Sequence, residues 1–119
     1  MSPRPFTCPC CGHRTFSGFP GSYELCGVCF WEDDGAQLLD PAHAGGANAL
    51  SLMDSQANYA RIGACEECFV DNVRPPTAVE VRDPDWRPAR ASDLEGARTP
   101  RDLTRAEYQR IETWYYWKR

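Results

Sequence analysis

The sequence predicts a small α+β protein, in which a hairpin unit with two thiol turns is followed by two short helices and a C-terminal helix. Three observations predict this class. Two Cys-x-x-Cys pairs lie near the amino end, separated by 14 residues. Apolar residues then recur at helical spacing between Ser51 and Gly63, which are typical start and stop residues of a helix. Finally, a capping-box sequence opens an aromatic segment near the carboxyl end.

The two cysteine pairs predict a metal site. A Cys-x-x-Cys turn directs two sulfurs toward one point, and a second such turn completes a tetrahedron with metal–sulfur distances of about 2.3 Å. One structural Zn²⁺ in a zinc-ribbon-like unit is the predicted occupant, although a four-thiolate site also suits iron. The predicted ligands are Cys8, Cys11, Cys26 and Cys29.

Short β-prone pieces flank the first thiol turn, at 6–7 and 14–16, and predict a tight hairpin there. Gly12 and Gly27 are expected to give the two turns the backbone freedom that they need. His13, next to the first turn, is a reserve ligand.

Disulfides are the main alternative use of these thiols. Seven cysteines are an odd number, which suits a disulfide framework poorly. The chain begins Met1-Ser2-Pro3-Arg4-Pro5, without an apolar signal segment, so we expect a cytoplasmic address, where thiols stay reduced.

Composition indicates an ordinary globular protein, with 42% hydrophobic and 25% charged residues. We expect a cysteine-rich metal-binding domain at 1–79 and an irregular, Pro-rich wrap plus a helix at 80–119, packed on the same domain. No apolar run approaches the roughly 18 residues of a membrane span. Residues 1–79 carry nine acidic against four basic side chains. This balance argues against a nucleic-acid backbone as the partner. An acidic face is most often simply a solvated one, and where it has a function it fits a basic protein better than nucleic acid.

Between the thiol turns and the first helix lies an acidic turn, Glu32-Asp33-Asp34. Neighbouring carboxylates can perform acid–base chemistry, but we expect these to be solvated and to belong to an interaction face. The first helix is predicted to follow Ser51 and to end at Gly63. A second short helix is predicted over Glu66–Asn72 and ends before the Pro75-Pro76 pair.

Several stretches together resemble the bacterial CPCC family of cysteine-rich, zinc-ribbon-like proteins. They are Cys-Pro-Cys-Cys-Gly at 8–12, Gly-Ser-Tyr-Glu-Leu-Cys-Gly-Val-Cys-Phe-Trp-Glu-Asp-Asp at 21–34, Ser-Leu at 51–52, Ile-Gly-Ala at 62–64 and Val-Arg-Pro-Pro at 73–76. The resemblance covers about residues 6–76 and implies a metal site at the four predicted ligands. Cys10 also occupies one of the family's cysteine positions, whereas Cys65 and Cys68 do not.

Cys65 and Cys68 form a third pair with the same spacing. On a helix these positions share a face, so the two thiols could meet and act as a redox pair or a metal sensor, with or without Cys10. The glutamates between them oppose thiolate formation. We therefore expect idle or buried thiols.

Beyond residue 76, the sequence predicts a short strand over 77–82 and no regular structure over 83–100. The segment Thr104-Arg105-Ala106-Glu107 predicts the start of a helix that runs to residue 118. On a continuous helix, Tyr108, Ile111 and Tyr115 share the face that docks on the body. Trp114 and Trp117 then point elsewhere. Two roles are open for them: they are candidate interaction residues, or they complete a thin core.

The sequence contains no recognisable arrangement of nucleophile, base and orienting group, and we expect no enzyme activity. The favoured hypothesis is a zinc-stabilised protein that acts by protein–protein interaction, as an inhibitor or immunity-type protein against a basic partner. A thiol redox or metal-sensing protein and a zinc-ribbon protein associated with nucleic acid are the two alternatives.

Overall fold

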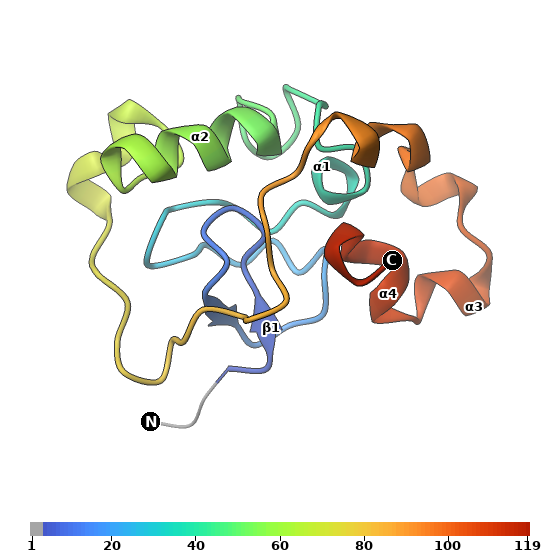
Figure 1. Ribbon diagram of the computed structural model, residues 1–119, viewed down its shortest axis with the longest axis horizontal. Coiled ribbons are helices and arrows are strands. Elements are labelled where there is room, and N and C mark those ends of the chain that lie inside the picture. Colours follow the sequence, from blue (N-terminus) through green and yellow to red (C-terminus); the bar gives the residue numbers. More distant parts are fainter. Residues whose placement is uncertain (1–3) are drawn as a thin grey trace.

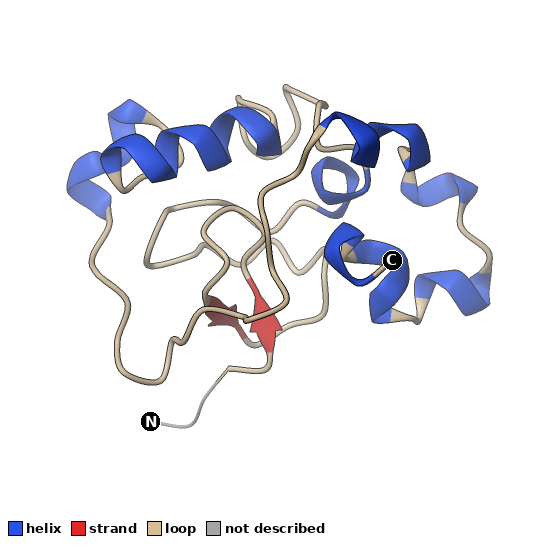
Figure 2. Ribbon diagram, viewed as in Figure 1, coloured by secondary structure: helices blue, strands red, loops and turns tan. Residues whose placement is uncertain are grey.

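The computed structural model describes residues 4–119. The expectation of a cytoplasmic address depends in part on Met1, Ser2 and Pro3, and these three lie outside the described residues. Two short strands, β1 (Phe6–Thr7) and β2 (Arg14–Phe16), pair antiparallel (Figures 1 and 2). They form the only sheet within residues 4–119. They occupy the residues that the sequence predicted for the hairpin.

A helix that the sequence analysis missed follows the second thiol turn. It is α1 (Gly35–Leu39), and Asp34 caps it by accepting hydrogen bonds from the backbone N–H groups of Ala36 and Gln37. A cap of this kind satisfies donors that the first turn of a helix leaves free. The prediction that Asp34 is a solvated interaction residue is therefore wrong, because its carboxylate is buried at the helix start.

Asp33 is also buried, and the prediction of a solvated side chain is wrong for it too. Its Oδ2 atom accepts a hydrogen bond of 2.7 Å from the hydroxyl of Ser22. Burial raises the pKa of Asp33 to about 6, and the hydrogen bonds from Ser22 and Gly21 oppose this rise. Of the predicted acidic face, only Glu32 keeps partial exposure.

Two helices confirm the predictions for the middle of the chain. Helix α2 (Leu52–Ile62) begins at Ser51, whose hydroxyl accepts a hydrogen bond from Asp54 N, and ends at Gly63 with φ 76°. The left-handed conformation of Gly63 is the usual end of a helix at glycine. The second predicted helix is present as the 3₁₀ helix η1 (Glu67–Asn72).

The predicted strand over 77–82 is wrong. Arg82 forms a single antiparallel bridge with His13, and the preceding residues turn instead, with a hydrogen bond from Glu80 N to Thr77 O. The turn buries the Glu80 carboxylate, which forms two hydrogen bonds with the guanidinium of Arg74. The same carboxylate accepts a hydrogen bond of 2.9 Å from Thr77 N, and a local bond of this kind favours a turn over an extended strand.

The segment 83–100 was predicted to lack regular structure, which is wrong at two places. It contains the 3₁₀ helix η2 (Ala91–Gly96), and η3 (Pro100–Asp102) follows at its end. An aspartate stabilises the start of each one: Asp93 accepts from Arg90 N at 2.8 Å, and Asp102 accepts from Thr99 N at 2.9 Å. Aspartate bonds of this local kind favour short turns of helix.

The aromatic C-terminal segment is three short helices rather than one. They are α3 (Arg105–Tyr108), α4 (Ile111–Trp114) and η4 (Tyr116–Lys118). The predicted capping box is confirmed at its start, where Thr104 and Glu107 exchange hydrogen bonds. The backbone leaves the helical conformation at Arg110 and at Tyr115, so the three pieces do not share one axis.

Because the helix is broken, the side chains do not follow a single helical period. Trp114 is 1% exposed and Trp117 is 9% exposed, whereas Tyr108 is 50% exposed. Of the two roles open for these tryptophans, completion of the core is the one found, and the prediction that Tyr108 docks on the body is wrong. Trp114 also donates a hydrogen bond from Nε1 to the carbonyl of Tyr108.

One apolar core includes both the thiol turns and the C-terminal segment. Thr7 of the hairpin donates a backbone hydrogen bond to the hydroxyl of Tyr115, and its own hydroxyl donates to Asp83 at 2.8 Å. No helix within residues 4–119 is long and apolar enough to cross a membrane. The largest buried side chains of this core are Phe16, Trp31, Leu38, Leu39, Leu52 and Trp114.

The side-chain amide of Gln56 on α2 joins three distant segments. Its Nε2 atom donates to the carbonyl of Pro9 in the first thiol turn and to the hydroxyl of Tyr116, both at 2.9 Å. Its Oε1 atom accepts from the backbone N–H of Ala89 in the wrap. Gln56 is buried, so all three bonds are shielded from water.

This network gives a prediction for Tyr116, whose hydroxyl also donates to the carbonyl of Arg87. Tyr116→Phe leaves Gln56 and this carbonyl each with one partner fewer. We expect the free energy of unfolding of the metal-loaded protein to fall by about 1–2 kcal/mol, as measured by chemical denaturation.

The matched control is Tyr108→Phe, because Tyr108 is half exposed and its hydroxyl makes no hydrogen bond within residues 4–119. That change should cost less than about 0.5 kcal/mol. Equal losses in the two variants would contradict the role assigned to the Gln56 network.

Candidate metal centre

The first pair of predicted ligands lies in the turn that connects β1 and β2. The backbone N–H of Cys8 donates to the carbonyl of His13 at 2.9 Å, and the N–H of Gly12 donates back to the carbonyl of Cys8 at 2.8 Å. Gly12 has φ 80°, in the left-handed region that favours glycine. These two bonds close a compact loop, which we call the first knuckle (residues 8–13).

The second pair repeats this geometry in the second knuckle (residues 26–31). The N–H of Cys26 donates to the carbonyl of Trp31 at 2.9 Å, and the N–H of Phe30 donates to the carbonyl of Cys26 at 2.8 Å. Phe30 stands where the first knuckle has Gly12, and it has φ 70°. A left-handed backbone is costly for a residue with a side chain, so the loop closure must hold Phe30 in place.

Gly27 was predicted to supply the backbone freedom of the second knuckle, and the structure gives it another role. The left-handed residue of this loop is Phe30. A Cβ atom on Gly27 would lie 2.9 Å from Nη2 of Arg74, the residue that pairs with the buried Glu80. Gly27 therefore leaves room for a guanidinium beside the knuckle.

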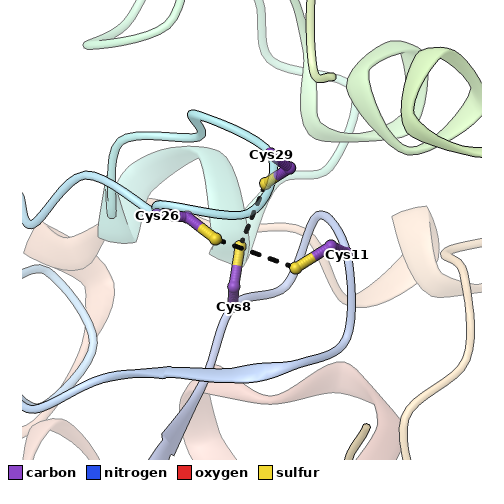
Figure 3. A group of neighbouring side chains, drawn as sticks. All are labelled: Cys8, Cys11, Cys26 and Cys29. Atoms are coloured by element: carbon purple, nitrogen blue, oxygen red, sulfur yellow. Dashed lines mark hydrogen bonds between the residues drawn. The ribbon is translucent and has the colours of Figure 1, made fainter. Parts of the chain in front are cut away.

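The two knuckles bring all four predicted ligands together (Figure 3). Cys8 Sγ lies 3.6 Å from Cys29 Sγ, Cys11 Sγ lies 3.8 Å from Cys26 Sγ, and the four sulfurs lie within 4.8 Å of one another. A tetrahedron with metal–sulfur distances of about 2.3 Å has sulfur–sulfur edges of about 3.8 Å. The spacing of the sulfurs thus fits a tetrahedral four-thiolate metal site.

These distances also exclude disulfides within the cluster. A disulfide bond is about 2.05 Å long, far shorter than the 3.6 and 3.8 Å between the facing sulfurs. All seven cysteines have free thiols.

The electrostatics of the cluster match a site built for a cation. Burial raises the pKa of Cys8 and of Cys29 well above the ordinary value. The pKa of Cys26 is lowered by hydrogen bonds, first from Cys11 and then from Cys29 and Cys8, with a further one from the hydroxyl of Thr15 at 3.2 Å. Four buried thiols do not all ionise unaided, and a divalent cation bound there would supply the missing positive charge.

Contacts behind the ligands fix both knuckles. The carbonyl of Pro9 accepts a hydrogen bond from Trp86 Nε1 at 2.9 Å, in addition to the bond from Gln56. The Trp86 ring covers Gly12 so closely that a Cβ there would lie 2.5 Å from the ring. In the second knuckle, the carbonyl of Cys29 accepts from Cys65 N at 2.8 Å. Supporting bonds of this kind orient metal ligands.

The remaining candidate thiols lie outside the cluster. Cys10 and Cys65 are buried and Cys68 is exposed. Cys65 precedes η1 whereas Cys68 lies within it, so the two do not share a helical face as predicted. Burial raises the pKa of both Cys10 and Cys65. His13, the reserve ligand, is not among the clustered residues, and its Nδ1 atom lies 2.7 Å from the carbonyl of Glu80.

The sequence analysis did not predict the hydrogen bonds of Thr15, Gln56 and Trp86 or the left-handed backbone of Phe30. A signal for Phe30 exists in the sequence, because aligning the two Cys-x-x-Cys-x pieces places it opposite Gly12. The hydrogen bonds of Thr15 and Gln56 join residues far apart in the chain. Such bonds cannot be predicted from a local sequence pattern.

No curated protein matches the chain. The model of the family described as "Cysteine-rich CPCC" matches residues 6–80. This range contains both knuckles and ends at Glu80, the partner of Arg74. Because the match covers well over half of the 119 residues and includes the four clustered cysteines, the chain belongs to the cysteine-rich CPCC family.

Proposed function

We propose that this protein binds one structural Zn²⁺ through Cys8, Cys11, Cys26 and Cys29, in a zinc-ribbon-like unit. The observation that carries this proposal is the separation of 3.6 and 3.8 Å between facing sulfurs, which suits tetrahedral zinc. Four cysteine ligands fill the tetrahedral coordination of zinc, so the metal would have no open position for a substrate, and all four ligands are buried. Such a site supports folding rather than catalysis, and the protein acts as a binding protein, not an enzyme.

The partner is another protein, and a basic one. Residues 1–79 hold an excess of five negative charges, and complementary charge speeds and directs protein association. Inhibition of, or immunity against, a basic partner is the role that this charge supports. The reducing cytoplasm is its proposed location, because free thiols persist there.

Two other functions draw less support. A thiol redox protein needs an accessible thiol of low pKa, whereas Cys10 and Cys65 are buried and burial raises the pKa of each. Cys68 is exposed, but it does not share a helical face with Cys65, its predicted redox partner. A protein that binds nucleic acid needs clustered cations, and the half of the chain that carries the cysteines is acidic.

The metal prediction concerns stoichiometry and stability together. Purified protein should contain one zinc per chain, measured by elemental analysis. Cys8→Ser or Cys26→Ser should lose both the metal and the folded state, because zinc sites of this kind contribute on the order of 10 kcal/mol to folding. An absorption spectrum typical of iron would identify the metal as iron instead of zinc, and the four ligands would stay the same.

Its control replaces the three other thiols together, as Cys10→Ala, Cys65→Ala and Cys68→Ser. This variant should still bind one zinc and remain folded. A loss of metal here, or a folded wild-type protein without metal, would contradict the proposed ligand set.

The interaction prediction is tested by affinity capture. The metal-loaded protein is immobilised on a matrix, and the matrix is incubated with an extract of the cells that produce the protein. We expect it to retain a protein of positive net charge, identified by mass spectrometry, and to release that protein as salt is raised, since salt screens charge attraction. The same matrix after metal removal serves as the control. Retention of nucleic acid alone, or of nothing that the control does not also retain, would contradict the proposed function.

A further inference from the structure

A shallow apolar groove of about 310 Å³ lies beside the second knuckle. We call it the Phe30 groove. Its size is at the low end of the range of ligand pockets, about 300–1,000 Å³, and suits one or two large apolar side chains. Its lining residues are Leu25, Phe30, Glu32, Ala47, Asn48, Ala49, Glu66 and Phe69.

One wall of the groove, the loop at 47–49, is held in place before any partner arrives. Gln37 of α1 is fully buried, and its Nε2 atom donates to the carbonyls of His43, Asn48 and Leu50. The side chain of Asn48 in turn forms two hydrogen bonds of 2.9 Å with the backbone of Glu32: its Oδ1 atom accepts from the N–H group, and its Nδ2 atom donates to the carbonyl. A loop fixed in this way loses little conformational freedom when it binds.

The floor of the groove is Phe30, whose ring centre lies 4.7 Å from that of Phe69. The left-handed backbone of Phe30 is costly, and the equivalent position in the first knuckle is glycine. Phe30 is half-buried and shares this backbone conformation with one other non-glycine residue of the described chain, Tyr23. Backbone strain of this kind occurs at ligand-binding sites. Leu25 adds a side chain that is 52% exposed.

Two carboxylates stand at this apolar surface without partners. Within residues 4–119, the side chains of Glu32 and Glu66 form no salt bridge and no hydrogen bond, and no cation lines the groove. By contrast, Glu24, Glu67, Glu80 and Glu107 are each paired with an arginine. The groove thus combines an apolar floor with unbalanced negative charge.

A second groove, of about 400 Å³, lies near Val28 and Tyr59 but lacks this combination. Its charged residue is Arg74, and the buried carboxylate of Glu80 already neutralises it. The second groove therefore carries no unpaired charge that would favour one kind of occupant. The unpaired carboxylates of the Phe30 groove favour an occupant with positive charge.

We propose that the Phe30 groove binds a segment of the partner protein in which a large apolar side chain is flanked by Lys or Arg. The apolar side chain contacts Leu25 and Phe30, and the basic side chains pair with Glu32 and Glu66. This inference rests on the proposed function and specifies where its basic partner docks.

The test uses a displayed library of random 12-residue peptides, selected against the metal-loaded full chain. Selected peptides should share an apolar residue flanked by Lys or Arg. For a synthetic copy of the most enriched peptide, fluorescence anisotropy should show at least about a tenfold loss of affinity in Leu25→Ser and in the double variant Glu32→Gln/Glu66→Gln.

Matched controls keep the interpretation specific. Val81→Ser changes another exposed aliphatic side chain, 51% exposed, and Glu95→Gln changes an exposed carboxylate outside the groove. Both should bind the peptide with affinity unchanged within about twofold. Unchanged metal content in every variant would show that the fold is retained.

Three results would overturn the proposal: no enriched peptide, enriched peptides without basic residues, or equal losses in groove and control variants. The proposed function fails separately. If the wild-type chain captures a basic protein from its cell extract and the groove variants capture it equally well, the function stands and the Phe30 groove is not the docking site. If the wild type captures none, the proposed function itself is wrong.

Discussion

The convergence of four cysteine sulfurs is the constraint on which the rest of this structure depends. The sheet has only two strands of two and three residues, and an isolated hairpin of that size is not stable in water. Each knuckle is closed by the same pair of backbone hydrogen bonds, and the two loops meet at their facing cysteine sulfurs. A metal shared by both loops would supply a strong link, and small proteins commonly stabilise a thin core in this way.

The later part of the chain is organised around these knuckles. Trp86 covers Gly12 and bonds the carbonyl of Pro9, while Gln56 connects the same carbonyl to Tyr116. Residues 81–119 lie beyond the family match and still supply part of the apolar core. The C-terminal aromatic residues therefore complete the core. The docking surface that we propose lies at the second knuckle instead, where the groove beside Phe30 is lined by Glu32 and Glu66.

Local patterns predicted the parts of the molecule that local chemistry determines. The cysteine spacing predicted the clustered ligands, and Ser51 and Gly63 marked the ends of α2. Predictions were wrong where distant contacts decide the structure: Tyr115 leaves the helical conformation, and its hydroxyl accepts a bond from Thr7, 108 residues away. The sequence analysis placed Asp34 in a turn and missed the helix that it caps, because five residues show too little apolar periodicity to predict a helix.

The central claim is that the metal and the packed aromatic core form one cooperative unit. The most direct measurement is a titration of the zinc-loaded protein with a chromogenic chelator, which reports released metal while near-ultraviolet circular dichroism reports the packing of Trp31 and Trp114. We predict that the aromatic signal disappears in proportion to the zinc released, because these side chains lie in the same core as the ligands. Complete release of zinc with an unchanged aromatic signal would contradict the account.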